Sequence, residues 1–88
     1  FNPSTRFVAG LPDAANLRVE VYNILGQKVA TLVDEARDAG YHTIVWNGTT
    51  DNGIAVSSGV YFVRMNADKP SAGPGERFTA LRKVMMLK

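Results

Sequence analysis

The sequence predicts a small all-β domain, built as an antiparallel sandwich of six to seven strands. Several segments alternate apolar and polar residues with a period of two, and they are rich in β-branched and aromatic side chains. Glycine, proline, asparagine and aspartate gather between these segments, as turns require. Two packed sheets are the natural way to bury one face of each strand. The expected strands cover residues 5–9, 17–22, 28–33, 41–46, 59–67 and 77–87.

The clearest strand is predicted over residues 17–22, where three aliphatic residues alternate with Arg18 and Glu20. Alternation with period two is typical of a half-buried strand, so the aliphatic side chains should face the core and the charged ones should face solvent. A turn is expected at residues 23–26, with Gly26 in the left-handed conformation. The residues expected inside are Leu17, Val19 and Val21.

Residues 28–33 fit both a strand and a helix. Their apolar spacing and the glycine at position 40 are compatible with a short helix over residues 29–38, which is the alternative. Against the helix, Val and Thr side chains are stiff in helices, and the segment follows a strand through a tight turn. We therefore predict a strand that ends at Val33, followed by a charged loop or a single helical turn to Ala39.

A long loop over residues 47–58 joins two strands that should be central to the fold. Trp46 ends the first strand and Tyr61 lies near the start of the second, and both aromatic rings are expected in the core. A second loop is predicted over residues 68–75, which contain two prolines and two glycines. In the last strand, Phe78, Ala80, Val84 and Met86 share one face with Arg82, whereas Leu81, Met85 and Leu87 occupy the other.

The totals indicate one domain over residues 1–88 and exclude several classes of partner. A net charge of +2 is too small to indicate nucleic acid binding. The chain has no cysteine, which leaves neither a disulfide framework nor a thiolate metal site. No apolar run approaches the roughly 20 residues of a transmembrane helix. Because the chain opens at Phe1 without a methionine, we expect it to be a piece of a larger protein.

The sequence shows no constellation of catalytic, cofactor-binding or metal-binding residues. His42 is the only histidine, and nothing marks a serine or carboxylate as its partner, so a packed or edge histidine is expected. Residues 51–53 have the composition of part of a calcium loop. In the register of such a loop, however, Gly48 and Gly59 would occupy the first and twelfth ligand positions, and neither carries a carboxylate. A turn is therefore expected there, and no enzyme activity, cofactor or metal is predicted.

Five phrases follow one another along almost the whole chain. The first runs from Asn-Pro to Leu-Pro, and the second is Val-Glu-Val-Tyr-Asn-Ile-Leu-Gly-Gln-Lys-Val. Ala-Gly-Tyr-His with Trp-Asn-Gly and then Ser-Gly-Val-Tyr-Phe follow, and Arg-Lys-Val-Met-Met-Leu-Lys closes the chain. In this order they resemble the C-terminal sorting domain of type IX secretion cargo proteins, whose fold is similar to the immunoglobulin-like (Ig-like) domain of the flagellar hook-capping protein. The phrases lie within residues 1–12, 19–29, 39–48, 58–62 and 82–88.

The resemblance implies an Ig-like β-sandwich that acts as a non-catalytic address at the C-terminus of an exported protein. Its partners would be an outer-membrane secretion translocon, a processing peptidase and a cargo domain upstream in the same chain. The domain would cross the periplasm and reach the cell surface or the extracellular space. A receptor could recognise the last strand by strand addition or by charge. The expected partner-recognition residues are Arg82, Lys83 and Lys88, and the expected structural residues are Gly26, Gly40, Trp46, Gly48, Gly59 and Tyr61.

The alternative is a structural or carbohydrate-binding accessory module of a secreted enzyme or adhesin. Exposed aromatic side chains stack on sugar rings in such modules, and Tyr41 and Phe62 are the candidates in this sequence. An enzyme is the least favoured class, because the sequence lacks an acid, base and nucleophile in a recognisable arrangement.

Overall fold

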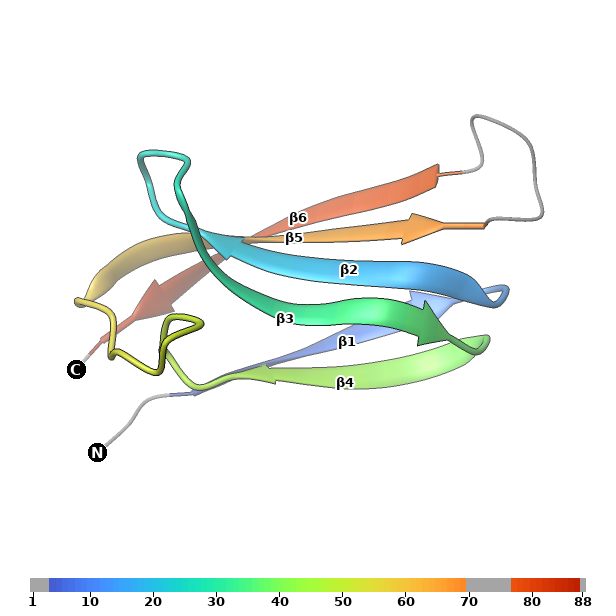
Figure 1. The fold of residues 1–88 in the computed structure, drawn as a ribbon, viewed down its shortest axis with the longest axis horizontal. Coiled ribbons are helices and arrows are strands. Elements are labelled where there is room, and N and C mark those ends of the chain that lie inside the picture. The colour runs from blue at the N-terminus through green and yellow to red at the C-terminus, as the bar shows by residue number, and fades with distance from the viewer. Residues whose placement is uncertain (1–3, 70–76, 88) are drawn as a thin grey trace.

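The computed structural model describes residues 4–69 and 77–87, and six antiparallel strands run through these two ranges. Four of the strands form one sheet in the order β3-β2-β5-β6, and the other two form a second sheet, β1-β4. Figure 1 shows the smaller sheet lying across one face of the larger one. The predicted all-β sandwich is therefore confirmed. The strands are β1 (Thr5–Leu11), β2 (Ala15–Tyr22), β3 (Lys28–Arg37), β4 (Gly40–Trp46), β5 (Gly59–Asp68) and β6 (Arg77–Met86).

The core lies between the two sheets and follows the predicted alternation. In β2, every second residue from Ala15 to Val21 is buried, and in β5 the buried residues run from Tyr61 to Ala67 in the same way. Trp46 is 1% exposed, and its ring meets that of Tyr61 edge to face with 5.2 Å between ring centroids. This geometry is favourable for aromatic pairs. The largest fully buried side chains are Trp46, Leu17, Val19, Val21 and Val63.

The turn between β2 and β3 forms at the predicted residues. Gly26 has a φ of 81°, which only glycine adopts freely. The Asn23 side-chain oxygen accepts hydrogen bonds from the backbone N–H groups of Leu25 (2.9 Å) and Gln27 (3.0 Å). Asparagine thus closes the turn with its own side chain, as its frequency in turns suggests.

Strand β3 is longer than predicted, and this corrects two expectations. The strand continues past Val33 to Arg37, so residues 34–37 form neither a charged loop nor a helical turn, and the alternative helix over residues 29–38 is also wrong. The reason is the pairing with β2, which extends to Ala15 opposite Arg37. The charged residues of this half of the strand are tolerated because they lie at the edge of the sheet, where their side chains reach solvent.

Residues 47–58 form the expected loop, which carries one isolated bridge between Thr49 and Ala55. The loop is attached to the sandwich at both ends by aromatic side chains. The Trp46 Nε1 donates a hydrogen bond to the Thr49 carbonyl (2.9 Å), and the Tyr61 hydroxyl donates one to the Ser57 carbonyl (2.7 Å). The two core aromatics therefore also satisfy backbone carbonyls of the loop.

Candidate functional site

Strand β6 carries the basic residues expected to contact a partner, and it lies at the edge of the larger sheet. Arg82 is opposite Val63 in the pairing with β5, and Lys83 is opposite Phe62. Val63 is fully buried and points into the sandwich, so Arg82 is on the inner side of the sheet and Lys83 is on the outer side. The structure thus separates these two cations, although both side chains are exposed. Lys88 lies outside the described residues.

The outer side of β6 is apolar as well as basic. Leu81, Met85 and Leu87 are each more than half exposed, and Lys83 lies between the first two. Because the strand edge beyond β6 has no neighbour among the described strands, its backbone N–H and C=O groups alternate toward solvent. A partner strand could pair with this edge, as the sequence suggested.

The residues expected to be structural take part in turns, strand ends and the core. Gly26, Gly40 and Gly48 have φ values of 81°, 127° and 74°, all in the region that favours glycine. Gly48 is also buried, and its carbonyl accepts a hydrogen bond from the Val56 N–H (2.9 Å). Gly59 begins β5 with a φ of 156°. These glycines allow the backbone conformations of the loop and the turns.

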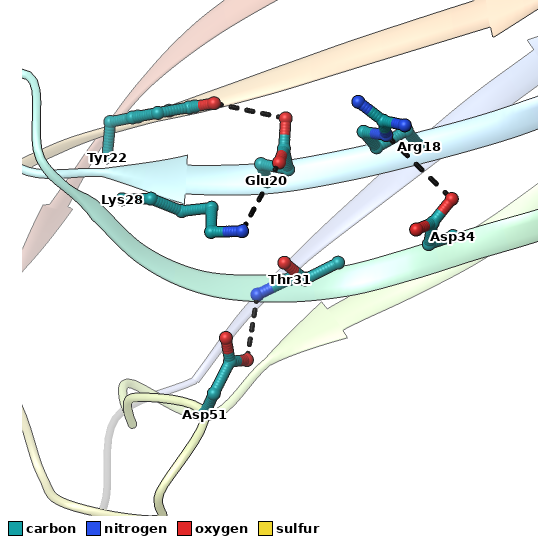
Figure 2. A network of polar contacts seen from close by, with 7 residues as sticks. All are labelled: Arg18, Glu20, Tyr22, Lys28, Thr31, Asp34 and Asp51. Carbon is teal, nitrogen blue, oxygen red and sulfur yellow. Dashed lines mark hydrogen bonds and ion pairs between the residues drawn. The ribbon is translucent and has the colours of Figure 1, made fainter.

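A polar network on the outer side of β2 and β3 was missed at the sequence level (Figure 2). Glu20 was expected to face solvent freely, but it is 9% exposed. Its carboxylate accepts a hydrogen bond from the Tyr22 hydroxyl (3.0 Å) and lies 3.8 Å from the Lys28 ammonium. Further along, Arg18 pairs with Asp34 at 3.8 Å. The two ion pairs link β2 to β3, and only knowledge of the strand register could have revealed them, whereas Glu20 and Tyr22 lie on one face of the same strand.

The network also holds the loop against β3. The Asp51 carboxylate accepts a hydrogen bond of 2.9 Å from the backbone N–H of Thr31. The β2–β3 register shifts between Val19 and Glu20, next to the position where Glu20 pairs with Thr31. Asp51 therefore satisfies a backbone donor at an irregular place in the edge strand, and the turn at residues 51–53 has a structural role.

Tyr22 has a shifted acidity because of its neighbours. Burial raises the pKa of the Tyr22 phenol above its ordinary value of 10.0, and the hydrogen bond to Glu20 and its negative charge raise it further. The nearby guanidinium groups of Arg64 and Arg18 lower it in part. Arg64 lies over the Tyr22 ring, 5.2 Å from its centroid, which is a cation–π contact.

We expect this shift to appear as a loss of stability in alkali. The folded protein favours the protonated phenol, so its contribution is complete below about pH 10 and declines as the pH rises from there through the higher folded pKa. The free energy of unfolding, measured in urea between pH 8 and pH 11.5, should fall less for Tyr22→Phe than for the wild type. Tyr41→Phe is the matched control, because Tyr41 is 86% exposed. An alkaline decline as steep in Tyr22→Phe as in the wild type would contradict the assignment.

His42 and Tyr41 lie on strand β4, whereas the other candidate stacking residue, Phe62, lies on β5. A ring nitrogen of His42 is 2.7 Å from the Asp38 carbonyl oxygen, which places the histidine at the β3–β4 turn. Tyr41 is opposite Gly10 in the β1–β4 pairing, and its ring covers the space above this glycine. Phe62 is half-buried on the outer side of β5. Tyr41 is thus the more accessible of the two aromatic candidates.

The described residues contain no group of three or more His, Asp or Glu side chains arranged to hold a metal ion. Over residues 4–69 and 77–87 there is also no helix long and apolar enough to cross a membrane.

Two antiparallel sheets packed over a Trp–Tyr core define the class as an Ig-like β-sandwich module. The family model of the FlgD Ig-like domain matches residues 4–71. The chain therefore belongs to the FlgD Ig-like domain family, which is a structural, non-enzymatic family.

A solved structure supports the same fold. The crystal structure of FlgD from P. aeruginosa is similar to this chain with a TM-score of 0.70 and 21% sequence identity. The match covers 92% of this chain and 59% of the FlgD chain, so the present chain corresponds to about three-fifths of that structure. No curated protein matches the sequence.

Proposed function

We propose that the chain is a C-terminal sorting domain that directs an exported cargo protein through the outer-membrane type IX translocon to the cell surface. The observation that carries this proposal is the position of the closing phrase. The strand with Arg82 and Lys83 is an edge strand, and both side chains are exposed. The ordered set of five phrases along the chain, on an Ig-like sandwich, supports the same function.

In this function the sandwich is the scaffold, and β6 is the segment that the translocon recognises. The translocon would pair with the free edge of β6 and contact Lys83 and its apolar neighbours on the outer side, because backbone pairing gives affinity and the side chains give specificity. A processing peptidase would act after passage through the periplasm. The residues upstream of the domain would belong to the cargo of a larger exported protein.

The test is a secretion assay with charge reversals in place of a truncation. Deleting residues 82–88 would also remove Met86, which is 2% exposed, and would confuse recognition with folding. The chain should be fused behind a leader and a fluorescent reporter in a host that has type IX secretion. We expect the wild-type fusion to reach the surface and the double variant R82E/K83E to lose most of the surface signal.

The control is R6E, which reverses one charge on the exposed face of β1, and it is compared with the single variants R82E and K83E. It should be secreted like the wild type. Surface delivery of R82E/K83E at the wild-type level would overturn the role of the basic strand. A wild-type fusion that stays in the periplasm would overturn the sorting function as a whole.

A second candidate function, carbohydrate binding, is favoured by one observation. Tyr41 is 86% exposed on β4, and its ring lies so close to Gly10 of β1 that a Cβ atom on this glycine would come within 3.1 Å of it. An exposed ring of this kind can stack on an apolar sugar face. Calorimetric titration against a panel of polysaccharides should give heat that is lost in Tyr41→Ala if this function is correct, and no heat for any member would exclude it.

A further inference from the structure

The two sheets of the sandwich differ in width, and the difference leaves one side open. The smaller sheet has two strands among the described residues, and the larger has four. Strand β4 contacts β3, to which it is joined by a short turn, so the smaller sheet covers the β3 side of the larger sheet. The opposite side of the larger sheet, at the start of β6, is therefore less covered in the part of the chain that the structure describes, whereas the end of β6 reaches the core, since Met86 is 2% exposed.

The side chains of β6 show the consequence. By register, Phe78 and Ala80 lie on the same side of the sheet as Ala67 and Met65, both of which are buried. Phe78 is nevertheless 61% exposed, and Ala80 is half-buried. The sequence predicted these residues on the core face, and the register confirms the face. Phe78 remains exposed because β6 extends beyond the cover of the smaller sheet.

A groove runs between this uncovered face and β1. Its volume is about 150 Å³, and residues 8–11 of β1 form one wall while Phe78 and Ala80 form the other. Arg82 is the only charged residue in the lining. It has no carboxylate at ion-pair distance within residues 4–69 and 77–87. The groove is thus mainly apolar, with one cation that lacks a counter-charge in the described structure.

The β1 wall of the groove is also a free strand edge. Strand β1 pairs with β4 alone, so the alternate N–H and C=O groups on its other edge have no strand partner among those described. Neighbouring strands lie about 4.8 Å apart and packed sheets about 10 Å apart. A strand added beside β1 would therefore lie opposite β6, at the normal distance for sheet packing.

We propose that this groove binds an extended segment of a partner polypeptide, which adds to the free edge of β1 as the third strand of the smaller sheet. The bound segment places alternate apolar side chains against Phe78 and Ala80 and a carboxylate beside Arg82. The exposed apolar wall favours a strand with period-two alternation, and the isolated cation favours an acidic residue in it. This inference does not depend on the sorting function: the two share Arg82, whereas Lys83 on the outer side belongs to the sorting function alone.

The first experiment is a selection from a displayed library of random octapeptides against the intact 88-residue chain. We expect selected peptides to share apolar residues at every second position and one aspartate or glutamate. A synthetic selected peptide should protect the amides of β1 from hydrogen exchange and leave those of β3 and β6 unchanged. Because a strand bonds through alternate amides, N-methylation of one alternate set of peptide amides should abolish binding, and methylation of the other set should not.

Two charge reversals on adjacent residues distinguish peptide binding in the groove from binding on the outer side of the sheet. R82E should weaken binding of an acidic peptide by about tenfold or more, since a charge-assisted contact is lost and a repulsive one replaces it. Replacing the peptide carboxylate with lysine should restore binding to R82E. K83E should change the affinity less than about twofold, because Lys83 lies on the outer side. Circular dichroism should show that both variants are folded, as both side chains are exposed.

Several outcomes would overturn the proposal. The selection could enrich no alternating sequence, or the bound peptide could protect the amides of β3 or β6 from hydrogen exchange in place of those of β1. R82E and K83E could also change the peptide affinity equally. Self-association of the chain that protects the β1 amides in the absence of peptide would show that a second copy fills the groove, and this too would overturn it. Since the secretion assay uses a different readout, loss of peptide binding and loss of secretion can be told apart.

Discussion

Replacing Trp46 with alanine should destabilise the domain more than any other single truncation of a core side chain. The side chain is 1% exposed, and it combines three contributions: buried area, the edge-to-face contact with Tyr61, and the hydrogen bond to the Thr49 carbonyl. Truncating a buried Trp costs about 3–5 kcal/mol, against a total stability of roughly 5–15 kcal/mol for a domain. We expect the midpoint of thermal unfolding to fall by about 12 °C or more.

The unfolding of Trp46→Ala should be followed by far-ultraviolet circular dichroism, because the variant lacks the only tryptophan. Tyr41→Ala is the control, since it removes a large aromatic side chain from the same strand at an exposed position. Its cost should stay below about 1 kcal/mol, the value of a cross-strand contact such as that over Gly10. A Trp46→Ala variant as stable as Tyr41→Ala would show that the ring is not packed as described.

Much of the fold follows from local alternation, which is why it could be predicted. In β2 and β5, a period of two selects the buried side chains directly, because successive residues of a strand point to opposite faces. The turn at Gly26 was equally predictable, since a glycine and an asparagine there suit a left-handed position and a side-chain closure. These features depend on residues close together in the sequence.

The features that were not predicted depend on strand order. The extension of β3 to Arg37 is stabilised by pairing with β2, although its charged residues suggest a loop. Likewise, the burial of Glu20 results from contacts with Tyr22 and with Lys28 across the β2–β3 pair. Neither outcome can be read from composition or period, because the extension of β3 and the Glu20–Lys28 contact both depend on which strands are neighbours.

The candidate site was predicted as a group of residues, and the structure distributes it over two surfaces. Adjacent residues in a strand point to opposite faces, so Arg82 enters the groove beside β1 while Lys83 joins the outer side of the sheet. Alternation alone implied this separation. The surroundings of Arg82 could not be predicted, because they depend on the narrow second sheet, which leaves the start of β6 partly uncovered on its inner side.

The end of β6 offers the second large effect, through two adjacent methionines. Met86 is 2% exposed and opposite Gly59, whereas Met85 is 61% exposed on the outer side. Met86→Ala should cost about 2–5 kcal/mol in the free energy of unfolding, because the surrounding core cannot fully close the cavity. Met85→Ala makes the same chemical change on the surface, and its cost should be within about 0.5 kcal/mol. Urea unfolding followed by tryptophan fluorescence measures both.

The pair of methionine variants also tests how strand β6 would be recognised if it has the proposed sorting function. A strongly destabilising Met86→Ala beside a neutral Met85→Ala would show that the end of β6 is held in the core by the Met86 side chain. Only the edge and the outer side of the strand would then be available to a partner. In that case a partner must bind β6 while the strand remains folded in the sandwich. Equally small losses in the free energy of unfolding for both variants would mean that the end of β6 separates easily from the core. A partner could then bind the detached strand, but the burial of Met86 argues against this.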